Sequence, residues 1–118
     1  MTIDSLQARL REFAAERDWQ QFHDPKNLTM ALTGEVGELV ELFQWLTPDR
    51  SRSAMDDPDQ AAKVREELAD VFGYLLRLAD VLDVDLEQAL VDKIAVNELR
   101  YPADQARGRA DKYTRYQP

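Results

Sequence analysis

Apolar residues recur along most of the chain every three to four positions, the spacing of one face of an α-helix. Glycine is scarce, with four in the chain, and proline falls mostly between the periodic segments. We therefore predict an all-α protein, a four-helix bundle. The four expected helices run from about Asp4 to Asp18, from Pro25 to Trp45 or Leu46, from Asp59 to Leu82, and from Asp85 to Arg100.

Capping side chains mark several of the expected boundaries. Asp4 and Asp85 are candidate N-caps, and Asp24 followed by Pro25 is a typical opening of a helix. Residues 47–58 have the composition of a loop. Residues 103–118 are expected to be a polar, partly basic tail with incomplete order. The length of the chain suits one domain over residues 1–118.

The two middle segments carry long apolar stripes, which we expect to form the core. The stripe residues are Leu28, Leu32, Val36, Leu39, Val40, Phe43 and Leu46 in the first segment, and Val64, Leu68, Val71, Phe72, Leu75, Leu76 and Ala79 in the second. Both stripes follow helical periodicity. The two segments are therefore expected to pack against each other.

A pair of acids accompanies each stripe at an equivalent place. The sequence reads E-V-G-E-L-V from residue 35 and E-L-A-D-V-F from residue 67. Residues three positions apart lie on adjacent turns of one helix side. Glu35 and Glu67 thus lie at the stripe edges, with Glu38 and Asp70 one step further out. Helices packed side by side would bring the four carboxylates together.

Carboxylates at close range repel one another unless a cation neutralises them. Ligands that offer only oxygen suit Mg²⁺, with Mn²⁺ also possible, rather than zinc or copper. Mg²⁺ usually keeps water and completes its shell with substrate phosphate. We therefore predict that the catalytic metal ligands are Glu35, Glu38, Glu67 and Asp70. A metal site of this kind indicates phosphoryl chemistry.

The acids have two other interpretations. They could form the solvated face of a non-catalytic helical interaction module, with Lys63, Arg65 and Arg77 as ordinary ion-pair partners. A di-iron carboxylate bundle would need a Glu-x-x-His motif on two helices. The only histidine, His23, has no glutamate three positions before it, so the di-iron site is excluded.

The net charge of −8 argues against a nucleic-acid partner, because phosphate backbones bind basic surfaces. The negative charge does not exclude a nucleotide substrate, because a bound divalent metal can make the local charge positive. The absence of cysteine excludes disulfides and thiolate metal sites. No apolar run approaches a membrane span, and Met1 to Arg11 lacks an apolar signal core. We therefore expect a cytoplasmic protein with no membrane partner.

Several stretches together resemble a known family. They are F-A-A-E-R-D-W at 13–19, F-H-D-P-K-N-L at 22–28, G-E-V-G-E-L-V-E-L-F-Q-W at 34–45, E-E-L-A-D-V at 66–71 and N-E-L-R-Y-P at 97–102. The chain resembles the MazG-like all-α NTP pyrophosphatases from about residue 5 to residue 114, most of all the dCTP pyrophosphatase branch. The resemblance implies Mg²⁺-dependent cleavage of a triphosphate into NMP and pyrophosphate by a homodimer or homotetramer.

The resemblance also implies substrate-binding residues. The segment containing Lys93, Asn97, Arg100 and Tyr101 is similar to one whose lysine and asparagine lie near the phosphates in the family. Tyr74 matches a position that lines the site. Leu10 stands where members of the dCTP branch can carry a histidine.

Aromatic residues at the ends of the second predicted helix are candidates for a base pocket. Trp19, Phe22, His23 and Trp45 could stack on a base, which stabilises binding by about 1–3 kcal/mol per base. The resemblance implies that the substrate is dCTP or modified dCTP, which the enzyme would remove from the nucleotide pool. Alternatives are the same fold acting on dUTP, purine triphosphates or phosphoribosyl-ATP.

Overall fold

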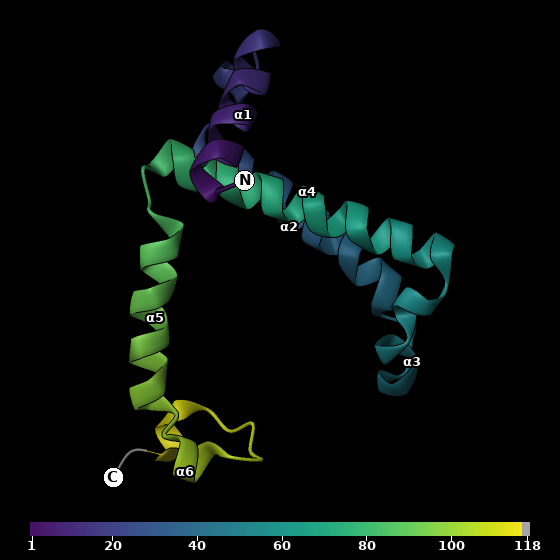
Figure 1. The fold of residues 1–118 in the computed structure, drawn as a ribbon, viewed down its shortest axis with the longest axis vertical. Coiled ribbons are helices and arrows are strands. Elements are labelled where there is room, and N and C mark those ends of the chain that lie inside the picture. Colours follow the sequence, from purple (N-terminus) through teal and green to yellow (C-terminus); the bar gives the residue numbers. More distant parts are fainter. Residues whose placement is uncertain (117–118) are drawn as a thin grey trace. The chain divides into compact units, whose positions relative to one another are not determined.

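A computed structural model describes residues 1–116 of the chain. In this range the elements are α1 (Ile3–Glu16), η1 (Gln20–Phe22), α2 (Pro25–Phe43), α3 (Pro48–Arg52), η2 (Ala54–Asp56), α4 (Pro58–Leu82), α5 (Leu86–Arg100), α6 (Ala103–Ala106) and η3 (Tyr113–Tyr116), where η denotes a 3₁₀ helix (Figure 1). The described residues form no strand. The predicted all-α fold is confirmed. Within the same range, no helix is both long and apolar enough to cross a bilayer.

The chain divides into two compact units, unit 1 from Met1 to Asp83 and unit 2 from Val84 onward. The single domain over residues 1–118 stays a prediction.

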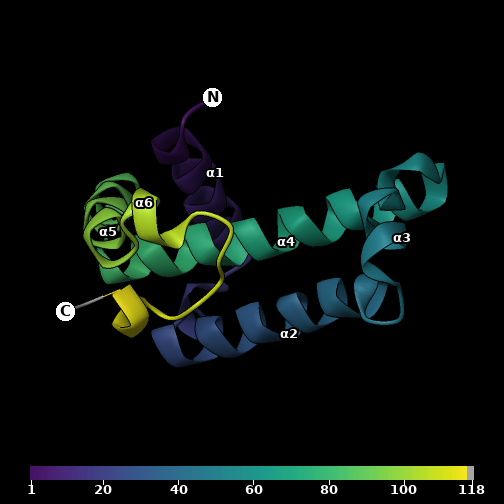
Figure 2. The ribbon, with the colours of Figure 1, turned by 90° about the horizontal axis from the view of Figure 1, so that it is seen from below.

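Unit 1 is built on the antiparallel pair α2 and α4, which lie side by side in both views (Figures 1 and 2). The Gln60 side chain on α4 donates to the Leu42 carbonyl oxygen of α2 at 3.1 Å. Helix α1 packs on α4, where the Gln7 side chain donates to the Leu76 carbonyl oxygen at 3.0 Å. The core of unit 1 is small and consists of Ala14, Leu28, Ala54, Ala61, Val64, Leu76 and Ala79.

Capping explains where these helices begin. Asp24, Asp57 and Asp85 each accept a hydrogen bond from a backbone N–H in the first turn of the helix that follows. The predicted openings at Asp24 and Asp85 are therefore confirmed. The prediction for Asp4 was wrong, because Thr2 caps α1 through a reciprocal pair of hydrogen bonds with Ser5.

The segment 47–58 was predicted to be a loop, but it contains α3 and η2. The Thr47 hydroxyl accepts from the Arg50 N–H at 3.2 Å, and Pro48 occupies the first turn of α3. A cap followed by proline is a helix-start signal, and it acts here over only five residues. Helix α1 also ends at Glu16, before the predicted Asp18, which has a left-handed backbone with φ of 54°.

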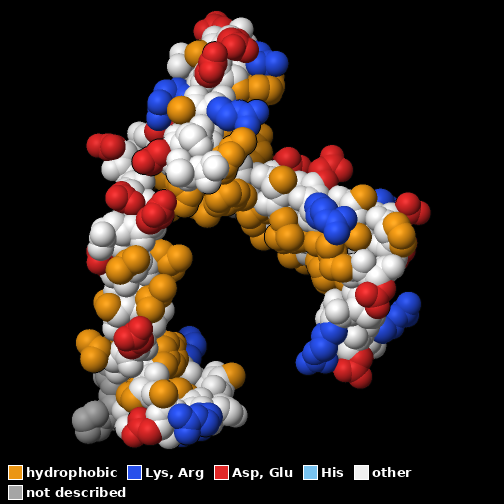
Figure 3. Space-filling view, viewed as in Figure 1, with side chains coloured by type: hydrophobic (Ala, Val, Ile, Leu, Met, Phe, Trp, Pro, Cys, Tyr) orange, Lys and Arg blue, Asp and Glu red, His pale blue; other side chains and the backbone are white. Residues whose placement is uncertain are grey.

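The expected core stripes are buried only in part. Leu28, Val64, Leu76 and Ala79 are buried as predicted. A larger set remains more than a third exposed, namely Val36, Val40, Leu68, Phe72 and Leu75. Side chains of this kind gather along the α2–α4 pair in Figure 3. Two helices cover each other only along their line of contact, which is narrower than these stripes.

In unit 2, α5 is followed by α6 and η3, and the tail is more ordered than predicted up to residue 116. Tyr101 makes edge-to-face contacts with Tyr113 and Tyr116, with ring centroids 6.4 Å and 5.8 Å apart. The Arg100 guanidinium lies over the Tyr113 ring at 4.6 Å. These aromatic contacts hold η3 against the end of α5. The last residues of the predicted tail, 117–118, lie outside the described residues.

Candidate active site

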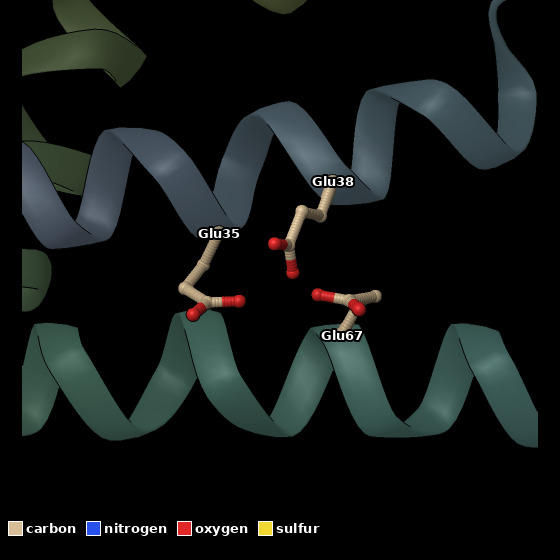
Figure 4. A group of neighbouring side chains, drawn as sticks. All are labelled: Glu35, Glu38 and Glu67. Atoms are coloured by element: carbon tan, nitrogen blue, oxygen red, sulfur yellow. The ribbon is translucent and has the colours of Figure 1, made fainter.

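Three of the four predicted metal ligands converge between α2 and α4. Glu35 and Glu38 point from α2 toward Glu67 on α4 (Figure 4). One carboxylate oxygen from each lies within 4.8 Å of the others. This arrangement follows from the i, i+3 spacing on α2 and the side-by-side packing of the two helices.

The burial and hydrogen bonding of the carboxylate oxygens in this cluster indicate whether a cation fits there. Glu35 Oε2 and Glu67 Oε2 are buried and have no hydrogen-bond partner within the described chain. Buried acceptors without a donor are costly, and a cation bound by both carboxylates would offset this cost. The donor set contains only oxygen, which suits a hard divalent ion. The residues present therefore fit a divalent-metal site.

The pKa values of the clustered carboxyl groups also support a cation site. Burial and the neighbouring carboxylate of Glu38 raise the pKa of Glu67 to about 7. Burial, Glu38 and Asp70 likewise raise the pKa of Glu35. Without a cation, the cluster thus retains protons at pH values where an isolated carboxyl group is ionised.

Asp70, the fourth predicted ligand, lies beside this group of three. It is exposed, and its charge contributes to the raised pKa of Glu35. It also lines a cavity of about 270 Å³ in unit 1. Because Asp70 follows Glu67 by one helical turn, it connects the carboxylate cluster to the cavity.

The cavity contains several of the predicted substrate-binding residues. It is lined by Leu10, Phe13, Trp19, His23, Ala69, Asp70, Gly73, Tyr74 and Arg77. Trp19 meets Phe13 edge to face at 5.7 Å, and the Arg17 guanidinium lies over the Phe13 ring at 3.7 Å. The structure therefore brings Trp19, His23 and Tyr74 together around one space.

Trp45 lies elsewhere in unit 1. Its side chain is 87% exposed, just past the end of α2. Helix α2 has 19 residues, which at 1.5 Å per residue span about 28 Å. This length separates Trp45 from Trp19 and His23, which precede α2. Within one chain, Trp45 does not line the cavity. Phe22 is also absent from the cavity wall and is 58% exposed.

The phosphate-binding candidates lie in unit 2. Lys93 is exposed and Asn97 is half-buried on α5. Arg100 and Tyr101 end this helix and contact the tyrosines of η3, as described above. Their part in the site stays a prediction.

The cavity wall also includes a buried charged residue that was not predicted as a site residue. Arg77 was expected among exposed ion-pair partners, but it is only 8% exposed. Its guanidinium donates from Nε to His23 Nδ1 at 3.0 Å and from Nη1 to Asp80 Oδ2 at 3.2 Å. The Arg77–Asp80 ion pair had a local signal in the sequence, because Asp80 follows Arg77 by three positions. The contact between Arg77 and His23 had none, because 54 positions separate the two residues.

Most of the chain also matches the model of a known family. Residues 31–115 match the model of the MazG-like family, and the chain belongs to this family. The resemblance predicted from the sequence motifs is confirmed.

Individual relatives are similar over most of the chain. dCTP pyrophosphatase 1 of Mus musculus is 49% identical over 113 residues, covering 96% of this chain and 66% of that protein. The Homo sapiens protein of the same name matches with the same identity and coverage. The chain thus spans just under two thirds of the length of these relatives. A crystal structure of a pyrophosphatase from Archaeoglobus fulgidus has a TM-score of 0.78 at 39% identity, covering 84% of this chain and 91% of that chain.

The raised pKa of Glu67 predicts how metal-free stability depends on pH. Between its ordinary value of 4.5 and about 7, the folded state holds a proton that the unfolded state releases. Raising the pH through this window therefore removes stability. We expect the thermal midpoint without metal to fall between pH 5 and pH 8, and added Mg²⁺ to reverse the fall.

The Glu67→Gln variant is the control. It is needed because His23 also changes the pH dependence of folding stability, in the opposite direction. Burial and then Arg77 lower the pKa of His23, so its contribution to stability rises as pH increases toward 6.5. The difference between wild type and Glu67→Gln isolates the carboxyl group. Parallel pH profiles for the two proteins would contradict the prediction.

Proposed function

We propose that the chain is a Mg²⁺-dependent nucleoside triphosphate pyrophosphatase that hydrolyses dCTP or modified dCTP to the monophosphate and pyrophosphate. The observation that carries this proposal is the position of Asp70. It lies one turn from a three-carboxylate cluster and also lines an aromatic cavity. A metal-bound phosphate chain and a bound base would then be neighbours.

The ligands would be Glu35, Glu38, Glu67 and Asp70, with Mg²⁺ preferred and Mn²⁺ as an alternative. When bound, the metal supplies charge neutralisation and orientation for the phosphate groups. The two buried oxygens without partners support this assignment. The names of the mouse, human and archaeal relatives support pyrophosphate release as the reaction.

The cavity would hold the base. Ligand pockets typically measure about 300–1,000 Å³, and this cavity of about 270 Å³ is slightly smaller. We infer that it takes the nucleoside and that the triphosphate extends toward the acids. Trp19 would stack on the base, and Tyr74 and His23 would bound it. Leu10 makes one part of the wall apolar.

The active form would be a homodimer or homotetramer. Uncovered apolar side chains on α2 and α4 support this, because large exposed apolar patches mark interaction sites. A second copy could bring Trp45, Lys93, Asn97, Arg100 and Tyr101 to the site. The net charge of −8 supports a small-molecule substrate rather than nucleic acid. In a cytoplasmic setting, the activity would remove unwanted pyrimidine deoxynucleotides from the precursor pool.

A substrate panel tests the proposal. We expect Mg²⁺-dependent release of pyrophosphate and monophosphate, with kcat/KM for dCTP at least about tenfold above those for dATP and dGTP. The panel should include dUTP, 5-methyl-dCTP and phosphoribosyl-ATP. Equal kcat/KM values for all bases would contradict the dCTP preference. No turnover of any triphosphate would favour a non-catalytic helical module.

A further inference from the structure

A chain of hydrogen bonds runs from the cavity wall to the surface of unit 1. His23 Nδ1 accepts from Arg77 Nε at 3.0 Å, and Arg77 pairs with Asp80. Arg11 on α1 holds the same carboxylate through two hydrogen bonds, Nε to Oδ2 at 3.0 Å and Nη2 to Oδ1 at 2.7 Å. The network joins α1, α4 and the segment that precedes α2.

The direction of these bonds fixes where protons lie. A guanidinium carries donors only and stays protonated at every physiological pH. His23 Nδ1 must therefore offer its lone pair to Arg77, and the proton of the neutral ring must lie on Nε2. An imidazolium would place its Nδ1–H against the Arg77 Nε–H, with two positive charges in contact.

We propose that Arg77 is a positioning residue that fixes His23 as the neutral Nε2–H tautomer, so that His23 presents a hydrogen-bond donor to a nucleotide in the cavity. Arg77 occupies Nδ1, so Nε2 is the nitrogen left for a ligand. His23 lines the cavity. The nature of the ligand rests on the proposed function, whereas the tautomer rests on the hydrogen bonds alone.

The surroundings favour this state of the ring. Arg77 is buried, and Asp80 compensates its charge. Hydrogen bonds from Arg11 lower the pKa of Asp80, so the carboxylate stays ionised. Burial and the Arg77 charge lower the pKa of His23. The other ionisable groups on the cavity wall are Asp70 and Tyr74.

A fixed donor would select among substrates. It accepts a ligand group with a lone pair, such as a base carbonyl or ring nitrogen, or a sugar or phosphate oxygen. A group that offers only N–H at this point would leave two donors facing each other, and such mismatches are strongly rejected in buried sites. Arg77 would then influence specificity through His23 without touching the base itself.

Nitrogen NMR tests the tautomer directly, because His23 is the only histidine in the chain. In ¹⁵N-histidine-labelled protein at pH 7, we expect Nε2 to be protonated and Nδ1 to have the shift of a bare ring nitrogen. Arg77→Met should give mixed tautomers and move the histidine pKa up toward 6.5. Arg11→Met is the matched control, because it removes an Asp80 partner but leaves the Arg77–His23 contact, so the wild-type tautomer should remain.

A protonated Nδ1 in the wild type would overturn the proposal. A folded Arg77→Met variant in which His23 keeps the wild-type tautomer and pKa would overturn it as well. The wild-type spectrum decides even where that variant does not fold.

Titration with dCMP and with deoxyribose 5-phosphate then tests the donor role. Calorimetry establishes the dCMP concentration that saturates the protein. At saturation, we expect the ¹⁵N chemical shift of Nε2 to change more than that of Nδ1. A shift with dCMP alone assigns the acceptor to the base, and a shift with both ligands assigns it to the sugar or phosphate. Saturation without a change at Nε2 overturns the donor role. Failure of dCMP to bind would instead count against the proposed function, because the tautomer is measured in ligand-free protein.

Discussion

Replacing Glu38 with glutamine should lower pyrophosphate release at least about 100-fold while leaving the helical circular dichroism spectrum unchanged. Glu38 lies within 4.8 Å of Glu35 and Glu67 through its carboxylate oxygens. Its side chain is exposed, so the amide should not disturb the core. The loss of one anionic side chain should weaken the proposed cation site, on which the proposed phosphoryl chemistry would depend. Asp70→Asn should behave alike.

The matched control is Glu41→Gln on the same helix. Glu41 lies one turn beyond Glu38, is exposed and is outside the cluster. It should retain wild-type turnover. Retention of more than about a tenth of the activity in both Glu38→Gln and Asp70→Asn would disprove the metal-site assignment. Loss of helical signal together with activity would indicate a structural role for the acids.

The second large effect is expected at the uncovered apolar face of α2 and α4. Phe72 is 42% exposed and lies on one helix side with Leu68 and Leu75. In a symmetric dimer, Phe72→Glu would place two unpaired charges in the interface. At about 1.5–3 kcal/mol for each lost side chain, the dissociation constant should rise about 100-fold or more. Light scattering would then show a monomer, and activity should fall with assembly.

Ala62→Glu serves as the control, since it adds the same charge to an exposed position of α4 outside the stripe. It should keep the wild-type mass. Thermal unfolding of both variants separates loss of assembly from loss of fold. A wild-type protein that is monomeric and fully active at working concentration would refute the oligomer.

Local signals predicted most of the helix boundaries and the acid cluster. Asp24-Pro25 specifies a helix start within two residues, and the spacing of Glu35 and Glu38 places both on one helix side. The partner acid Glu67 needed only the additional assumption that two apolar stripes pack together. Each of these inferences depends on a few neighbouring residues.

Long-range packing produced the features that the sequence could not indicate. Arg77 looks like any charged helix residue, and its burial depends on α1 and on His23, 54 positions away. Periodicity identified the stripe containing Leu68 and Phe72 as apolar, but it cannot tell whether the same chain or another copy covers it. Trp45 is the opposite case, because the length of α2, which the sequence predicted, by itself separates Trp45 from the cavity.

Helix α4 is 25 residues long, and its buried residues are concentrated toward its two ends. Ala61 and Val64 are buried on one side of the acids and Leu76, Arg77 and Ala79 on the other, whereas residues 65–75 include no buried side chain. The stretch to which we assign the proposed chemistry is thus not the stretch that supplies the buried core of unit 1. Glu67 is an exception, because burial raises the pKa of its carboxyl group and so links its charge to folding stability. At the exposed positions of this stretch, such as Asp70, substitutions are expected to change the proposed site with little effect on the buried core.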